Sequence, residues 1–251
     1  MKRTLRFSIS TFISAAVLFC LCVAVLPGAK SRPEANGKKY STAPAGATVL
    51  FDGTDLGQWV NCHGDKPHWK LADGAMEVTP LKGHKCPRIQ GIKTAKLFGD
   101  FQLHVEFNLP QGEHVNSGIY LLRRYEVQII NSHGAKIGKS NCGELYKQRS
   151  PDRDMCDKPG VWQSYDIMFR APRFEKGPDG KPKKIENARI TVIHNGVAIH
   201  NNVIVKTKTG AGFPESPEPG PIMLQDHGSK VRFRNIWIVE SKPSVGGWSS
   251  K

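Results

Sequence analysis

Short stretches of alternating apolar and polar residues recur along the chain, and they constrain the fold more than any other feature. Between residues 101 and 107, Phe101, Leu103, Val105 and Phe107 alternate with polar residues. A period of two places successive side chains on opposite faces of a β-strand, so this strand has one apolar face. No segment of a dozen residues after position 46 sustains the 3.6-residue apolar period of a helix. The sequence therefore predicts an all-β protein.

Further strands follow at short intervals. They are predicted at 49–51, 119–122, 125–130, 165–169, 190–194, 197–199, 222–224 and 231–239. Gly, Pro and Asn separate them, as in the Asn195-Gly196 turn, which is typical of a sandwich or barrel. The segment 119–122 is apolar throughout, so it predicts a central strand that is buried on both faces. The charged, turn-rich segment 173–188 predicts an excursion on the surface.

The N-terminus has the parts of an export signal. Lys2, Arg3 and Arg6 precede an uncharged run at 7–26, which ends at Pro27-Gly28-Ala29. Residues 1–29 therefore predict a secretory signal, or an uncleaved membrane anchor because the apolar run is long. The chain is then expected to be periplasmic, extracellular or membrane-tethered, with membrane contact only through this segment.

The remaining chain divides by composition. Residues 30–46 are rich in Lys, Pro, Gly, Ser and Ala and predict a disordered linker. We expect one jelly-roll domain over 47–242, since all-β domains of this length are common, and a short tail over 243–251.

The formal net charge of +14 favours attraction to anionic surfaces or polymers. The sequence has no zinc finger, no helix-turn-helix pattern and no aromatic-rich motif for single strands. Its lysines are also scattered through predicted loops. We therefore expect no specific nucleic-acid partner.

Four cysteines follow the N-terminal segment. Cys62, Cys86, Cys142 and Cys156 allow three pairings, and an oxidising compartment favours disulfides. The most economical pairing joins Cys62 to Cys86 and Cys142 to Cys156. A four-cysteine zinc site is disfavoured because the chain lacks close Cys-x-x-Cys pairs.

Polar side chains gather on the faces of the predicted strands that point away from the core. Glu106 lies on the non-core face of 101–107, and Glu126 and Gln128 lie on that of 125–130. Such residues can simply be solvated, or can pair with Arg123 or Arg124 across a sheet. Carboxylates and amides in one groove are equally the groups that hold a sugar. His104, also on a non-core face, is expected at the surface.

Six sequence blocks resemble one family. They are "LFDGTDLGQW" (50–59), "GDFQLHVEFNLP" (99–110), "NSGIYLLRRYEVQI" (116–129), "WQSYDIMFRAPRF" (162–174), "HNGVAIHNNV" (194–203) and "GPIMLQDHG" with "VRFRNIWI" (220–238). The chain resembles the 3-keto-disaccharide hydrolases, also described as 3-keto-glucoside lyases and hydratases. This resemblance implies a concanavalin A-like jelly roll, a sandwich of two antiparallel sheets with a ligand groove on the concave face.

The resemblance also implies the site. The implied catalytic residues are Glu126, Glu106 and His227; the implied substrate-binding residues are Gln128, Asn116, Arg123, Gln225, Asp226 and Tyr146. The implied substrate is an oxidised 3-keto saccharide, cleaved by elimination and then hydrated. Glu126 or His227 would be the base and Glu106 the acid or its partner, while Arg123 or a bound divalent cation would stabilise the enolate.

Two alternatives stay open. His227 can cap a turn instead of acting on substrate, and a non-catalytic carbohydrate-binding module can share this fold. Asn131 stands where similar proteins usually have Asp, which weakens a metal site beside 125–130. No metal ligands are assigned from the sequence.

Overall fold

The computed structural model describes residues 42–80, 86, 88–112 and 114–241. The predicted signal or anchor, most of the predicted linker and the tail lie outside these residues. No helix in the described part of the chain has the length and apolarity needed to cross a bilayer. The secondary structure there consists of strands, as the alternation predicted.

The larger sheet has eight antiparallel strands. Its order is β13-β12-β9-β6-β15-β4-β3, with β1 paired to β15. These strands are β1 (Thr48–Phe51), β3 (Lys70–Ala72), β4 (Ala75–Glu77), β6 (Phe101–Asn108), β9 (Trp162–Arg170), β12 (Ala188–His194), β13 (Val197–Val205) and β15 (Arg232–Glu240). The pairing of β15 with β6 shifts register between Arg234 and Trp237.

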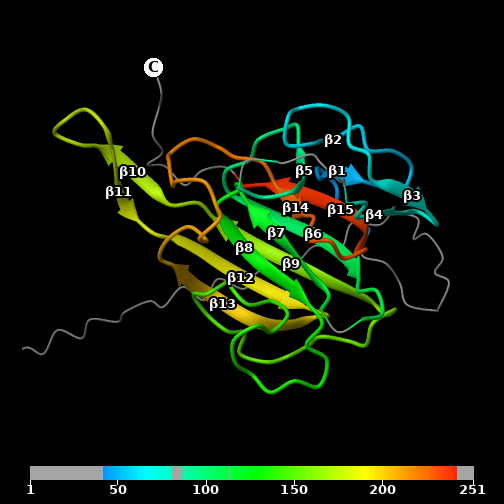
Figure 1. Ribbon diagram of the computed structural model, residues 1–251. Helices are drawn as coiled ribbons and strands as arrows, with labels where there is room; N and C mark the ends of the chain where they lie inside the picture. Colours follow the sequence, from blue (N-terminus) through cyan, green and yellow to red (C-terminus); the bar gives the residue numbers. More distant parts are fainter. Residues whose placement is uncertain (1–41, 81–85, 87, 113, 242–251) are drawn as a thin grey trace, which may run out of the picture.

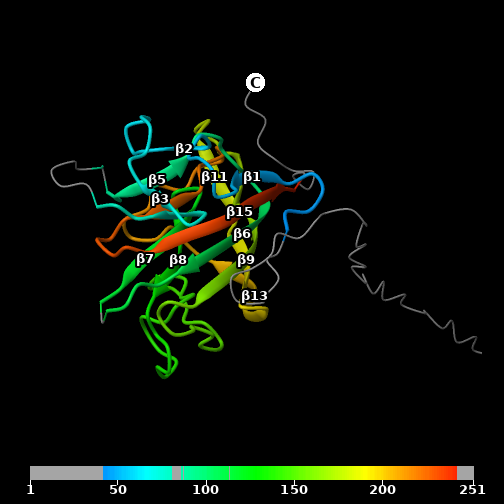
Figure 2. The ribbon, with the colours of Figure 1, turned by 90° about the vertical axis from the view of Figure 1, so that its right-hand side faces the viewer.

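The smaller sheet has five strands in the order β2-β5-β14-β7-β8. They are β2 (Trp59–Val60), β5 (Gly91–Thr94), β7 (Asn116–Leu121), β8 (Tyr125–Ile130) and β14 (Met223–Gln225). Figure 2, turned from the view of Figure 1, shows β5, β7 and β8 on one side and β6, β9 and β13 on the other. The two sheets pack face to face, and the predicted jelly-roll sandwich is confirmed.

The core lies between the sheets. Phe101, Leu103, Val105 and Phe107 of β6 are all buried, as are the alternate residues of β8. Burial of each such side chain contributes about 1.5–3 kcal/mol to folding, so the core fixes which face of every strand points inward. The central strand predicted at 119–122 is β7, which is buried on both faces and lies between β14 and β8.

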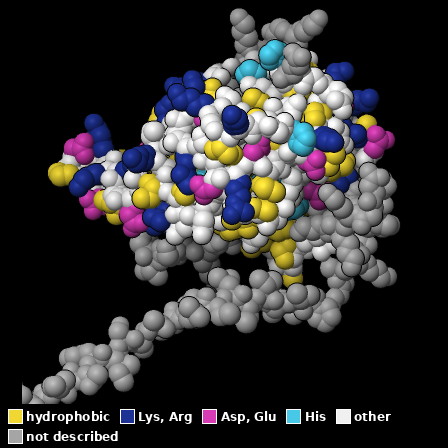
Figure 3. Space-filling model, turned by 90° about the horizontal axis from the view of Figure 1, so that it is seen from below, with side chains coloured by type: hydrophobic (Ala, Val, Ile, Leu, Met, Phe, Trp, Pro, Cys, Tyr) yellow, Lys and Arg dark blue, Asp and Glu magenta, His cyan; other side chains and the backbone are white. Residues whose placement is uncertain are grey.

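The predicted surface excursion is a projecting hairpin. Strands β10 (Arg173–Lys176) and β11 (Pro182–Glu186) pair only with each other and are mostly exposed. In Figure 3 this hairpin projects from the body, and Lys and Arg side chains on the face shown are interspersed with acidic and uncharged ones. That face shows no continuous positive stripe.

One of the two predicted disulfides is present. Cys62 and Cys86 are bonded, which confirms the first pairing. Cys142 and Cys156 are buried free thiols that hydrogen-bond to each other, so the second predicted pair lies together but is not bonded in the structure. The Sγ of Cys142 lies 3.0 Å from the hydroxyl of Tyr165, and the Sγ of Cys156 donates to the carbonyl oxygen of Ile130. Hydrogen bonds satisfy both sulfurs without a covalent bond.

Candidate active site on the five-stranded sheet

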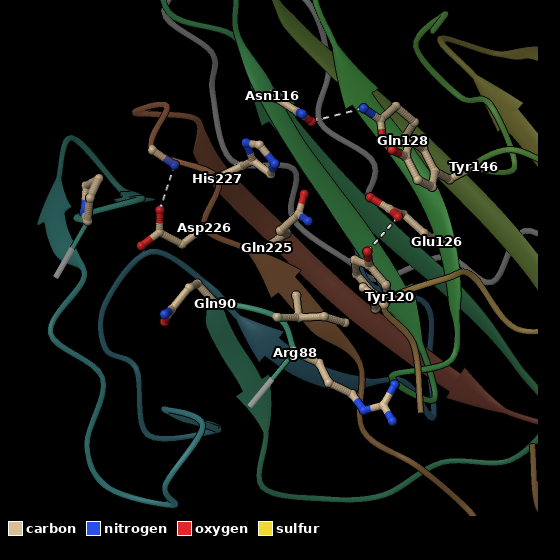
Figure 4. A pocket seen from close by; sticks show the side chains of 14 residues that line it. Arg88, Gln90, Asn116, Tyr120, Glu126, Gln128, Tyr146, Gln225, Asp226 and His227 are labelled. Atoms are coloured by element: carbon tan, nitrogen blue, oxygen red, sulfur yellow. Dashed lines mark hydrogen bonds between the residues drawn. The ribbon is translucent and has the colours of Figure 1, made fainter. Parts of the chain in front are cut away.

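A polar cavity of about 540 Å³ opens on the face of the five-stranded sheet that points away from the core. Strands β7, β8 and β14 form its floor, and the loops that precede β5 and follow β14 form its rim (Figure 4). It contains seven of the residues that the resemblance implied: Asn116, Glu126, Gln128, Tyr146, Gln225, Asp226 and His227. Alternation places them together, because Asn116 on β7 and Glu126 and Gln128 on β8 all face away from the core. We call this cavity the Glu126 pocket.

Glu126 is the buried acid at the floor of the Glu126 pocket. Only 4% of its surface is exposed, and the hydroxyl of Tyr120 donates a 2.6 Å hydrogen bond to its Oε2 (Figure 4). Burial raises the pKa of Glu126 to about 7; the Tyr120 hydrogen bond opposes this rise, and the charge of Glu144 adds to it. The carboxyl therefore exchanges its proton near neutral pH, as a general acid or base must.

Glycine at position 118 makes room for this carboxyl. Gly118 lies on β7 beside Glu126, and a Cβ added there would stand 2.6 Å from Oε1 of Glu126. A side chain at this position would force the Glu126 carboxyl to shift. The glycine thus allows Glu126 to lie flat and to reach Tyr120.

Two amide oxygens in the Glu126 pocket are ready to accept hydrogen bonds. The Nε2 of Gln128 donates to the Oδ1 of Asn116 at 3.0 Å, which fixes the orientation of the Gln128 amide. The Oε1 atoms of Gln128 and Gln225 are buried, and neither receives a hydrogen bond from the described residues. Buried acceptors of this kind cost free energy unless a ligand or water donates to them. Sugar hydroxyls are suitable donors.

The rim carries the remaining predicted residues. Oδ1 of Asp226 accepts from the backbone N–H of Gly228 at 2.9 Å, so Asp226 shapes the turn after β14. His227 is exposed on that turn and lines the pocket, while Tyr146 lines it from the loop after β8. The turn is therefore closed by Asp226, and the His227 side chain stays available to a ligand.

Among the pocket residues that were not predicted from the sequence, three have polar side chains: Arg88, Gln90 and Tyr120. Arg88 has a φ of 72°, and its guanidinium donates a 3.5 Å hydrogen bond to the carbonyl oxygen of Gly212. Tyr120 lies two residues from Gly118 and four from Asn116 on β7. A period of two counted from Asn116 would have placed its ring on the pocket face. No sequence pattern around 88–90 indicated a site.

The structure does not bring Glu106 into the Glu126 pocket. Glu106 lies on β6 of the other sheet, where Nε of Arg234 and Nδ2 of Asn235 donate to it at 2.7 and 2.8 Å. The predicted pairing of Glu106 with Glu126 in one groove is therefore wrong. Alternation showed that both residues face away from the core, but a sandwich has two such faces.

Arg123 is also displaced from its predicted position. It lies in the turn between β7 and β8, stacks over Phe213 at 4.1 Å and lines a neighbouring cavity. The cation that lines the Glu126 pocket is Arg88, in the position that was predicted for Arg123. Within the described residues, no three His, Cys, Asp or Glu side chains converge as metal ligands.

Comparisons with known proteins identify the family and agree with the fold. The 3-keto-alpha-glucoside-1,2-lyase-like domain matches residues 46–239. The chain is similar to a proposed glycosyl hydrolase from Parabacteroides distasonis ATCC 8503, whose crystal structure is known. The two sequences are 37% identical, and the two structures superpose with a TM-score of 0.68 over 80% of this chain and 86% of that chain. A second proposed glycosyl hydrolase from that organism is 22% identical, with a TM-score of 0.56 and coverage of 78% and 94%, which shows the fold alone. No curated protein matches the chain. The chain belongs to the 3-keto-alpha-glucoside-1,2-lyase-like domain family.

Proposed function

We propose that this protein is an exported carbohydrate-active enzyme that cleaves 3-keto-glycosides by elimination across C1–C2, followed by hydration. Membership of the family and the relative at 37% identity support a carbohydrate-active function. The observation that carries the enzymatic function is Glu126, a buried carboxyl whose pKa is raised to about 7 by burial. A purely binding module needs hydrogen-bond partners, but it does not need a carboxyl that exchanges its proton at neutral pH.

The chemistry begins at C2 of the sugar. A ketone at C3 acidifies the C2 hydrogen, so a carboxylate can take that proton and leave an enolate. The electron pair then forms the C1=C2 double bond while the C1–O bond breaks, and the departing oxygen receives a proton. Water next adds its oxygen to C1 and a proton to C2, so the net result is hydrolysis.

The residues of the Glu126 pocket suit these steps. We assign the removal of the C2 proton to Glu126 and the protonation of the leaving oxygen to His227, which is exposed at the rim. Arg88 is the cation that lines the pocket and stabilises the enolate oxygen. The amide oxygens of Gln128 and Gln225 accept hydrogen bonds from sugar hydroxyls. The cavity volume of about 540 Å³ falls in the range of small-molecule sites.

The test compares oxidised and unoxidised substrates. Purified protein is incubated with a chemically prepared 3-keto-glucoside and with its unoxidised parent, and release of the aglycone is measured. We expect cleavage of the keto form alone. Cleavage of both forms would indicate an ordinary glycosidase, and binding of sugar without turnover would indicate a non-catalytic module.

Export rests on residues 1–29, which lie outside the described residues. The intact mass of protein recovered from outside the cytoplasm would show whether this segment is removed. Recovery of the protein only from the cytoplasm would contradict export.

A further inference from the structure

A second cavity of about 680 Å³ lies at the β7–β8 turn, next to the Glu126 pocket. Three of its lining residues are basic, namely Lys93, Arg123 and Arg124, and none is acidic. Much of the remaining lining is apolar, including Leu97, Leu122, Phe213 and several prolines. A positive charge beside apolar walls attracts an anion more strongly than the same charge in open water. We call this cavity the Arg123 pocket.

The register of the sheet fixes the distance between the two pockets. Lys93 pairs with Met223, Met223 with Tyr120, and Tyr120 with Glu126, so these four residues form one row across β5, β14, β7 and β8. Three strand spacings separate Lys93 from Glu126, which is roughly 14 Å between their Cα atoms. A saccharide of two or three residues can span that separation.

The ring of Phe213, which lines the Arg123 pocket, is contacted by one arginine from each pocket. The guanidinium carbon of Arg123 lies 4.1 Å from the centre of its ring, and that of Arg88 lies 5.8 Å from the same centre. Arg88 lines the Glu126 pocket and Arg123 lines the Arg123 pocket. One lining residue of each cavity therefore contacts the same aromatic ring, which places the two cavities beside each other.

The backbone that presents Arg123 is strained. Leu122 and Arg123 have φ angles of 52° and 56°, a conformation that usually falls to Gly or Asn. Gly220 packs against the turn so closely that a Cβ there would stand 2.6 Å from the carbonyl oxygen of Leu122. Such strain persists where the surroundings enforce it, and it is concentrated at functional positions.

Arg124 anchors the same turn from the other side. Its guanidinium donates to the carbonyl oxygens of Pro214 and Glu218 and to the hydroxyl of Ser216. The nearby Glu215 carboxylate accepts from Tyr125 and Lys184, and its charge and that of Glu218 act on Arg124. Burial lowers the pKa of Lys93, and the charge of Arg123 lowers it further, so these two cations repel each other. An anion between them would relieve this repulsion.

We propose that the Arg123 pocket binds the anionic group, a carboxylate or a sulfate ester, of a saccharide whose reacting ring occupies the Glu126 pocket. This inference rests on the proposed function in taking the ligand to be a saccharide. It assigns Lys93 and Arg123 to recognition of the charge. The preferred substrates are then acidic oligosaccharides and not neutral ones.

The experiment measures a binding preference and needs no turnover. Isothermal titration compares a neutral disaccharide, cellobiose, with the same disaccharide ending in glucuronic acid, using the wild-type protein at low ionic strength. We expect the acidic disaccharide to bind about tenfold more tightly, as one charge-assisted contact would give. Lys93→Gln and Arg123→Gln should each abolish most of that preference. Lys181→Gln, in the turn of the exposed β10–β11 hairpin, removes the same charge outside the pocket and should retain the preference.

Three other outcomes would contradict the proposal that the Arg123 pocket binds an anionic group. Equal binding of both disaccharides, binding of neither, or a preference that survives in Lys93→Gln and Arg123→Gln would contradict it. Inorganic sulfate that binds as tightly as the acidic disaccharide would show a simple anion site. Lys93 lies on a regular strand, so Lys93→Gln keeps the test valid if Arg123→Gln disturbs the turn. The preference is independent of catalysis, so it can fail while keto-sugar cleavage succeeds, and the reverse.

Discussion

Glu126 and Glu106 are two glutamates with nearly the same burial and opposite chemistry. They are 4% and 6% exposed, and each lies on the non-core face of its own sheet. Burial alone would raise the pKa of both. For Glu106, hydrogen bonds from His104, Asn235 and Arg234, together with the Arg234 charge, outweigh burial and lower the pKa below its usual range. For Glu126 one tyrosine hydroxyl does not outweigh burial, and the pKa rises to about 7.

The opposite pKa shifts of the two glutamates distinguish a structural buried carboxyl, Glu106, from one that is available for proton transfer, Glu126. Glu106 belongs to a closed network in which His104 also contacts Asp166 at 2.7 Å and stacks on Trp237. Burial opposes the charge of His104, yet its two acidic neighbours raise its pKa to about 9, so it stays charged at neutral pH. A carboxylate held by two cations has little tendency to take a proton. Glu126 has no cation in hydrogen-bond contact among the described residues, so its proton affinity is left high.

The largest expected effect separates the two glutamates by turnover. Glu126→Gln removes the proposed base and should lower kcat on a 3-keto-glucoside by about 10²–10⁴-fold. Glu106→Gln should leave kcat within a few-fold once it is expressed per folded protein. Steady-state kinetics on both variants make the comparison.

A matched control is available on the exposed surface. Glu240→Gln makes the same change at a residue whose side chain pairs with Lys96 and lies outside the Glu126 pocket. It should behave as the wild type. If Glu106→Gln lost as much activity as Glu126→Gln, the division of roles between the two glutamates would be wrong.

The next effect is on stability, and here the order of the two variants reverses. Glu106→Gln leaves Arg234 and His104 without their buried carboxylate, so it should lower the free energy of unfolding by about 3 kcal/mol at pH 7. Glu126→Gln removes a carboxyl that resists ionisation and should cost nothing at that pH. Urea unfolding of both variants measures the difference.

The two glutamates should change the free energy of unfolding in opposite directions as the pH rises, because their pKa values are shifted in opposite directions. The stability that Glu106 contributes, with its lowered pKa, is present above pH 4.5 and is lost as the pH falls, so the penalty of Glu106→Gln should shrink in acid. Glu126 binds its proton more tightly in the folded state, so wild-type stability falls as the pH rises from 4.5 to about 7. Glu126→Gln lacks this titrating group, so its free energy of unfolding should not show that fall. Relative to the wild type, it should rise by roughly 3 kcal/mol over this interval. Parallel pH profiles for the two variants would contradict the assignment.

Much of the fold and most of the site could be predicted, for identifiable physical reasons. Strand alternation is dictated by the core, so the faces of β6 and β8 were correct. The resemblance then identified seven residues of the Glu126 pocket. The resemblance also placed Glu106 in that groove, and alternation could not correct the error because it gives a face but not a sheet. Which strands become neighbours is decided by pairing across the whole chain, which no local pattern records.

The remaining errors also come from long-range contacts. His104 was expected at the surface, but Trp237 from β15 covers its ring and leaves it 2% exposed. Arg88 enters the Glu126 pocket from an irregular loop that has no periodicity to interpret. Tyr120 could have been placed by counting in twos from Asn116, but its apolar neighbours suggested a strand buried on both faces. Its hydrogen bond to Glu126 was not visible in any pattern.

The smallest expected effect tests what Tyr120 does for Glu126. Its hydroxyl stabilises the ionised carboxylate, so Tyr120→Phe should raise the pKa of Glu126 further above 7. One hydrogen bond to a charged group contributes about 1.5 kcal/mol, which corresponds to about one pKa unit. The acid limb of the kcat–pH profile should therefore move up by about one unit. At pH 9 both enzymes have an ionised base, so the difference in kcat should nearly vanish.

A second tyrosine on the same sheet provides the matched control for that shift. Tyr125 also donates to a carboxylate, that of Glu215, but its ring faces the core and does not line the Glu126 pocket. Tyr125→Phe should leave the acid limb where it is. If Tyr120→Phe instead lowered kcat equally at every pH, Tyr120 would itself be donating a proton in the reaction. The raised pKa of Glu126 would then be a by-product of its burial, and the contrast with Glu106 would reflect structure alone.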